Sequence, residues 1–192
     1  MHWLMKNSVS DGVEEIVFFA REGYLLIEQY RYMCSLLRER KFPEAVYMEI
    51  SRRAVINAAI EVRDDIYEAA MFPYTGNLSG FLHDRFRVES EDEETLTTAV
   101  IDIQKDRDTL EKALGKYADE IYRKASEERE GYLKYISKLG LMPKIGVVDS
   151  LLYGNTQYYL GKIMKQKMNG YYFCACLDND NKPELFTTRR RK

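Results

Sequence analysis

The sequence has few of the residues on which several common protein classes depend. Among its 192 residues there are three cysteines and two histidines. A small, odd number of cysteines excludes a disulfide framework and favours a reducing, cytoplasmic setting. The histidines, His2 and His83, belong to no ligand-spaced cluster, which argues against a histidine metal site or a catalytic triad.

An excess of one charge is also absent, because 29 Lys and Arg face 31 Asp and Glu. A dedicated nucleic-acid binder shows a basic surplus, so no nucleic-acid partner is expected. No apolar run approaches the roughly 18 residues of a transmembrane helix, and the N-terminus has no signal-peptide pattern. With 45% hydrophobic and 12% aromatic residues, the chain is expected to fold around a core.

The first fifty residues predict a strand, a helix and a second strand. The apolar, β-branched and aromatic run Glu15–Ala20 predicts a buried strand, and Ala45–Ile50 predicts another. Between them, apolar residues of Tyr24–Arg40 recur at helical spacing. A strand, crossover helix and strand is the unit from which parallel sheets are built.

The last fifty residues repeat the alternation. Ile145–Asp149 predicts a third strand, Thr156–Met168 a helix stopped by Asn169–Gly170, and Tyr171–Leu177 a fourth strand.

The middle of the chain predicts helices only. They are Ala54–Ala70, Leu78–Phe86, a long amphipathic helix after Ser90 and a last helix over Glu127–Leu139. The apolar stripe Leu96–Ile121 of the long helix suits packing within its own domain, or alternatively against a partner. We therefore expect a discontinuous α/β domain over 1–53 and 140–186, a helical insertion over 54–139 and a flexible basic tail over 187–192.

In an open parallel sheet, ligands bind outside the carboxyl ends of the strands. After the first strand come Arg21, Glu22 and Gly23. Arg21 suits a bidentate pair with phosphate or carboxylate, and Gly23 lets the backbone approach a ligand closely. The alternative is that Arg21 forms a surface ion pair of small energetic value.

The second strand is followed by Ser51, Arg52 and Arg53. A serine that opens a helix offers its hydroxyl and a backbone N–H to an anion, and the arginines add donors. The alternative is that at least one arginine is a solvated residue at the helix start.

The third strand ends on Asp149, and Gly154, Thr156 and Gln157 follow. An acid at a strand end, before a loop that feeds a helix N-terminus, suits a phosphorylated ligand, with Asp149 on a ribose hydroxyl or Mg²⁺. Asp149 is alternatively only a helix-capping or turn residue. The sequence contains neither a G-x-G-x-x-G nor a P-loop motif.

Several segments together resemble a bacterial family. They are IVFFAREGYLL at 16–26, YMEISRRAV at 47–55, GYLKYISKL at 131–139, VVDSLLYGNTQYYL at 147–160 and GYYF at 170–173. They resemble the C-terminal region of predicted haloacid dehalogenase superfamily hydrolases encoded among surface-polysaccharide and glycosyltransferase genes. The resemblance covers roughly Trp3 to Leu177.

The resemblance implies an accessory domain that binds a phosphorylated sugar or nucleotide and works with a hydrolase or glycosyltransferase partner domain. The aspartate nucleophile of that superfamily, in an Asp-x-Asp pattern, lies in an N-terminal domain that this chain does not contain. Asp178 and Asp180 follow the last strand in a predicted turn, so the resemblance assigns no catalytic residue here. The family usually has Asp where this chain has Glu22.

The same strand ends are more distantly similar to those of phosphoribosyltransferases. In these enzymes an early strand ends in a pyrophosphate loop and a later one in an acidic loop that holds the ribose phosphate. Arg21–Gly23 and Asp149–Thr156 match in order, although Ser150 stands where a second acid is usual. The expected fold is a Rossmann-like, phosphoribosyltransferase-like parallel α/β sheet with a large helical insertion. Two alternatives remain for the function: a non-enzymatic helical interaction module or split-gene remnant, and a phosphoribosyltransferase-like enzyme.

Overall fold

The computed structural model describes residues 1–37, 40–90, 105–149, 154–173 and the strand at 186–190. These residues fall into two compact units. We call Met1–Arg52 with Leu133–Lys192 the α/β unit, and Arg53–Tyr132 the helical unit.

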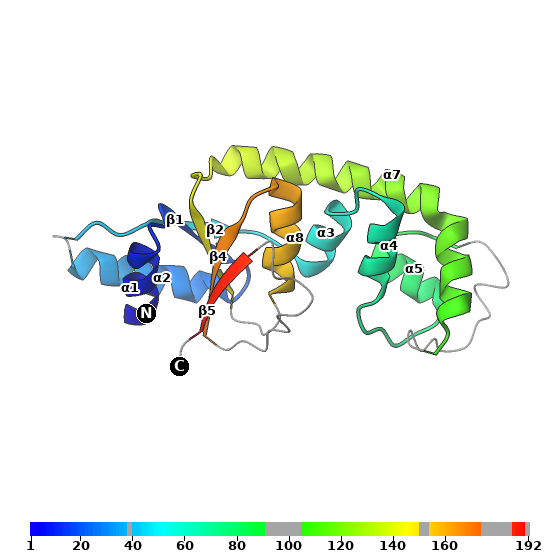
Figure 1. The fold of residues 1–192 in the computed structure, drawn as a ribbon, viewed down its shortest axis with the longest axis horizontal. Helices are drawn as coiled ribbons and strands as arrows, with labels where there is room; N and C mark the ends of the chain where they lie inside the picture. The colour runs from blue at the N-terminus through cyan, green and yellow to red at the C-terminus, as the bar shows by residue number, and fades with distance from the viewer. Residues whose placement is uncertain (38–39, 91–104, 150–153, 174–185, 191–192) are drawn as a thin grey trace. The chain divides into compact units, whose positions relative to one another are not determined.

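The α/β unit is built on a five-stranded, all-parallel sheet (Figure 1). Its elements are α1 (His2–Ser10), β1 (Glu15–Phe19), α2 (Gly23–Leu36), β2 (Glu44–Met48), β3 (Ile145–Asp149), α8 (Asn155–Met164), β4 (Met168–Tyr172) and β5 (Phe186–Arg190). The strand order is β2-β1-β3-β4-β5. The predicted α/β class, with a Rossmann-like parallel sheet and a helical insertion, is confirmed.

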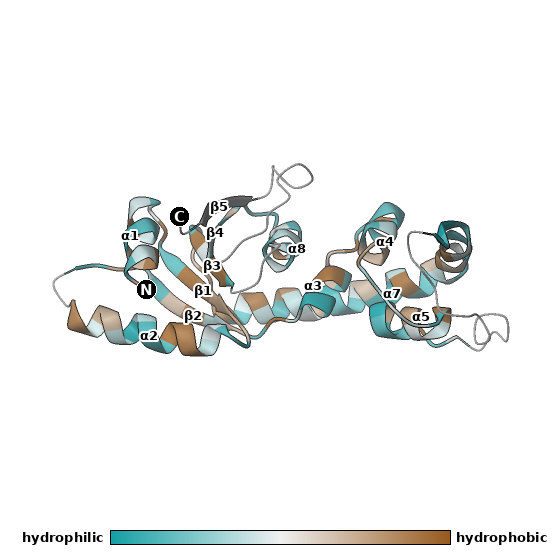
Figure 2. Cartoon of the chain, turned by 90° about the horizontal axis from the view of Figure 1, so that it is seen from below, coloured by the Kyte–Doolittle hydropathy of each residue, from teal (hydrophilic) through white to brown (hydrophobic). Residues whose placement is uncertain are grey.

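Helices cover both faces of this sheet, which explains why its central strands are largely apolar and buried. Every residue of β1 is buried, as parallel sheets with two covered faces require. Phe18 of β1 and Tyr171 of β4 pack with residues of α1 and α2, including Leu4 and Ile27. Tyr172, the next residue of β4, contacts α8 on the other face. Figure 2 shows the hydrophobic colour along the central strands, between α1 and α2 on one side and α8 on the other.

The helical unit contains α3 (Arg52–Ala58), α4 (Arg63–Ala70), α5 (Leu78–Phe86) and most of α7 (Arg107–Leu139), whose last turns belong to the α/β unit. The buried residues of α7 recur at helical spacing: Leu110, Ala113, Leu114, Ala118, Ile121 and Ala125. The described part of the predicted stripe is therefore buried against the chain itself. Its first members, Leu96 to Ile103, lie outside the described residues.

Several predicted boundaries are wrong. Helix α1 was not predicted, and the single helix expected over Ala54–Ala70 is two helices, α3 and α4. Arg129 explains that break, because its guanidinium donates to the carbonyls of Ala58 and Ile60 at the end of α3. Such side-chain donors satisfy the carbonyls that a helix end leaves unpaired.

Three further expectations about boundaries are corrected. One continuous helix, α7, replaces the two helices expected up to Leu139. Strand β4 starts at Met168, so Gly170 lies inside a strand and does not stop a helix. Helix α8 ends instead at Met164, and the next residue, Lys165, caps it in a left-handed conformation. Residues 187–190, expected in a flexible tail, belong to β5. Residues 174–177 of the predicted fourth strand lie outside the described ranges.

Candidate functional site

The strands of the sheet end at one level, which brings their following segments to a common edge. The register pairs Phe19 with Met48, Phe18 with Val148, and Asp149 with Tyr172. Phe19 therefore lies level with Asp149 on the neighbouring strand. We call the segments after β1 and β3, Ala20–Gly23 and Gly154–Gln157, together with Asp149, the switch-point edge.

We call this edge the switch point because the strand order reverses direction there. From β1 the chain passes through α2 to β2 on one side, whereas β3 lies on the other side of β1 and leads through α8 to β4. Right-handed crossovers that run in opposite directions place their helices on opposite faces, as α2 and α8 do here (Figure 1). In such sheets the loops diverge and leave a crevice at the point where the strand order reverses.

The turn after β1 is fixed by backbone hydrogen bonds. The Ala20 N–H donates to the Met48 carbonyl at 3.0 Å, and the Tyr24 N–H donates to the Arg21 carbonyl at 3.1 Å. The Arg21 N–H donates to the Glu22 carboxylate at 3.2 Å, and both side chains are exposed. The turn thus presents one cationic and one anionic side chain to solvent at this edge.

Gly23 begins α2 directly against β1. A Cβ on Gly23 would lie 2.9 Å from the carbonyl carbon of Phe18 and 3.1 Å from its Cβ. The missing side chain thus lets the first turn of α2 pack on the strand, one of the roles that glycine plays in strand-to-helix turns of dinucleotide-binding folds.

The connection from β3 to α8 provides the other half of the edge. Gly154 has φ +64°, the left-handed region that glycine adopts without strain. Its carbonyl accepts from the Tyr158 N–H at 2.9 Å, which closes the first turn of α8. Thr156 is buried within that turn. The preceding loop residues, 150–153, lie outside the described ranges.

Gln157, predicted to face a ligand, has its side chain engaged by the fold. Its amide donates to the Met168 carbonyl at 2.8 Å, and its Oε1 accepts from the Tyr172 hydroxyl at 2.7 Å. Gln157 is 1% exposed. These bonds hold the start of α8 against β4, so Gln157 positions the edge.

Tyr172 supports this edge through its bond to Gln157 and was not predicted as a site residue. Burial raises the pKa of its phenol, and the negative charge of Asp149 raises that pKa further. The electrostatic link is consistent with the register, which makes Asp149 and Tyr172 neighbours on adjacent strands. The sequence predicts a strand over Tyr171–Leu177, which places Tyr172 near its start, whereas β4 ends at Tyr172.

The segment after β2 divides between the two units. Ser51 and Arg52 are exposed, and nearby the Glu49 N–H donates to the hydroxyl of Tyr135 in α7 at 2.9 Å. Arg53 belongs to the helical unit, where its guanidinium donates to the Asp84 carbonyl of α5 at 3.5 Å. The structure thus gives Arg53 a partner inside the helical unit.

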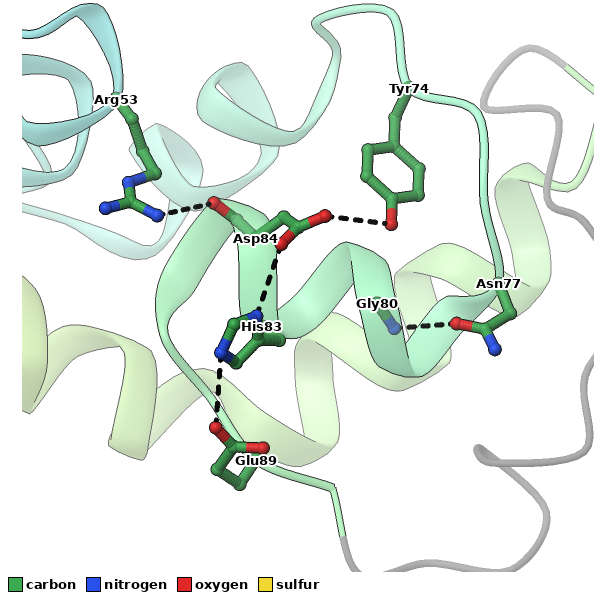
Figure 3. Close-up of polar contacts among 7 residues, drawn as sticks. All are labelled: Arg53, Tyr74, Asn77, Gly80, His83, Asp84 and Glu89. Carbon is green, nitrogen blue, oxygen red and sulfur yellow. Dashed lines mark hydrogen bonds and ion pairs between the residues drawn. The ribbon is translucent and has the colours of Figure 1, made fainter.

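A second polar cluster lies in the helical unit (Figure 3). The Asp84 carboxylate contacts His83 Nδ1 at 3.2 Å and accepts from the Tyr74 hydroxyl at 3.3 Å, and His83 Nε2 lies 3.4 Å from Glu89. The His83, Asp84 and Glu89 side chains are more than half exposed. The contacts of this cluster join α5 to its flanking segments.

Metal-binding groups are sparse in the described ranges, where no three His, Cys, Asp or Glu residues gather as a metal site would require. The expectation that Asp149 holds Mg²⁺ stays a prediction, and the edge also carries the exposed carboxylate of Glu22. Within the same ranges, no helix combines the length and apolarity needed to cross a bilayer.

In comparisons with known proteins, no protein-family model and no curated protein matches the chain.

Proposed function

We propose that the chain binds a phosphorylated sugar or nucleotide at the switch-point edge. One observation carries the proposal: the adjacent strands β1 and β3 end at the same level, and each leads through a glycine-containing turn into a helix. Helix N-termini present unpaired N–H groups and a positive dipole end, which favour phosphate.

The residues at the carboxyl end of the sheet would contribute to ligand binding in two ways. Charged side chains would contact the ligand, and a glycine would let the backbone approach it closely. The exposed guanidinium of Arg21 is suited to a bidentate contact with phosphate oxygens. Gly154 allows the backbone to approach the ligand, because no Cβ projects from it. Asp149 would accept from a sugar hydroxyl or hold Mg²⁺. Arg52, exposed after β2, is a further donor at the carboxyl end of the sheet.

The resemblance to haloacid dehalogenase-like hydrolases suggests where this binding would be used. We propose that the chain is the accessory domain of a haloacid dehalogenase-like protein in surface-glycan synthesis. The Asp-x-Asp nucleophile would then belong to a partner domain, and the ligand would be a substrate or product of that partner. This role requires binding without turnover by the isolated chain.

Isothermal titration with uridine diphosphate glucose, phosphoribosyl pyrophosphate and inorganic phosphate, with and without Mg²⁺, tests the binding. We expect at least one of the three to bind, and Arg21→Ala and Asp149→Asn each to weaken it at least tenfold. Arg31→Ala, a change of the same type further along α2, is the control and should bind as the wild type does. Absence of binding by all three, or unchanged binding by both variants, would overturn the proposal.

The same samples separate binding from transfer chemistry. Release of pyrophosphate from phosphoribosyl pyrophosphate in the presence of an acceptor base would indicate the phosphoribosyltransferase alternative. Binding without release supports the accessory role.

A further inference from the structure

A cavity of about 570 Å³ lies in the α/β unit, away from the switch-point edge. One wall is helix α1 and the other is the segment that leads into β2 at its amino end. The switch-point edge lies at the carboxyl ends of the strands, and a five-residue strand spans roughly 16 Å. The cavity is therefore a separate place on the same unit, and its volume is in the range of small-molecule sites.

Apolar side chains form part of the lining of this cavity. Val9, Leu37 and Phe42 provide large apolar side chains, and Val9 and Leu37 are 48% and 39% exposed. Burying apolar side chains of this size under a ligand is favourable, because it removes their surface from water.

Among the described residues that line the cavity, the charged side chains are cations. They are Lys6, Arg40 and Lys41, and no carboxylate is among the lining residues that the structure describes. In the part of the chain that the structure describes, none of these three cations forms an ion pair. Lys6 and Val9 are three residues apart on α1, so a cation and an apolar side chain share one face of the helix.

We propose that this cavity binds a single-chain amphiphilic anion, an alkyl chain that ends in a carboxylate or a phosphate. The chain lies against Val9, Leu37 and Phe42, and the anionic head contacts Lys6, Arg40 or Lys41. A purely polar anion leaves the apolar wall exposed, and a neutral alkyl chain leaves the cations without a partner. An amphiphilic anion matches both features.

The test is titration calorimetry on the full chain below the critical micelle concentration of each probe. Octanoate, decanoate and dodecanoate form a length series, and dodecyl phosphate tests the second head group. We expect the dissociation constant to fall about fifteen-fold for each added pair of methylenes until the cavity is filled. Dodecyl maltoside has the same chain without the charge and should bind at least tenfold more weakly than dodecanoate.

Two variants at exposed positions locate the site without disturbing the core. Val9→Asp should reduce dodecanoate affinity at least tenfold, and Lys41→Glu should reduce it several-fold. The matched controls are Val62→Asp, at a 57% exposed position of the helical unit, and Lys138→Glu, near the end of α7. Both controls should bind as the wild type does, and circular dichroism checks that all four variants are folded.

Three results would overturn the proposal. They are equal affinity for dodecyl maltoside and dodecanoate, unchanged binding by folded Val9→Asp, and binding to phosphatidylglycerol vesicles without binding of any of the four monomeric anions. The last would identify this face as a lipid-surface contact.

Discussion

The hydroxyl of Tyr172 donates a 2.7 Å hydrogen bond to Oε1 of Gln157, and the two residues join β4 to the first turn of α8. Both side chains are almost completely buried. The bond therefore fixes the helix N-terminus that forms half of the switch-point edge.

Tyr172→Phe should lower the free energy of unfolding by about 1–3 kcal/mol, because it leaves the buried Oε1 of Gln157 without its donor. Urea denaturation at pH 7 measures the change. Tyr32→Phe, at a 65% exposed position, is the control and should change stability by less than about 0.5 kcal/mol. Equal effects of the two substitutions would show that the buried bond contributes nothing.

Gly170→Ala should also destabilise the α/β unit, by about 1–3 kcal/mol or more. A Cβ on Gly170 would lie 2.1 Å from Oε1 of Gln157 and 2.5 Å from Cε2 of Tyr172. Gly131→Ala in α7 is the matched control, because a Cβ there meets nothing within 4 Å. It should stabilise the chain by about 0.5–1 kcal/mol, the usual gain from replacing a helical glycine. Thermal unfolding of both variants should thus show shifts of opposite sign, and shifts of the same sign would contradict this packing.

Glu128 of α7 makes the stability of the helical unit depend on pH. Burial raises the pKa of its carboxyl above the ordinary value of 4.5, against the opposing effects of a hydrogen bond from Asn57 and the charges of Arg53 and Arg87. The folded state therefore holds this proton more tightly than the unfolded state. Its contribution to stability is complete below pH 4.5 and is lost as the pH rises through the raised pKa.

Glu128→Gln should remove that part of the pH dependence, so the stability of the variant relative to the wild type should increase as the pH rises from 4.5 to 8. Urea midpoints across this range measure it. Glu127→Gln, whose side chain is 65% exposed, is the control and should follow the wild-type profile. Parallel profiles for the wild type and Glu128→Gln would contradict the account.

Much of the architecture could be predicted because the sequence pattern and the burial agree. The apolar runs that predict β1, β2 and β3 form strands within two residues of the expected bounds, and α5 spans the predicted residues Leu78–Phe86. Asn77, before this helix, accepts from the Gly80 N–H at 2.7 Å, as an N-terminal cap does.

The errors arise where tertiary contacts override local signals. Asn169–Gly170 has the composition of a helix stop, but Gly170 is needed in β4 because the Gln157 side chain occupies the space beside it. Helix α1 buries only Leu4, Met5 and Ser8, too short a pattern to indicate a helix. At the switch-point edge, the sequence predicted which segments follow the strands. It could not show that Gln157 is engaged by Tyr172 or that Arg53 contacts Asp84, because both depend on partners distant in the chain.

The most direct test of the central claim is a nuclear magnetic resonance titration of ¹⁵N-labelled protein with uridine diphosphate glucose. We expect the amide shift changes to concentrate at Arg21–Gly23 and Gly154–Gln157, and Arg21→Ala to reduce them. Changes confined to the α5 cluster around His83, or no changes at saturating ligand, would contradict it.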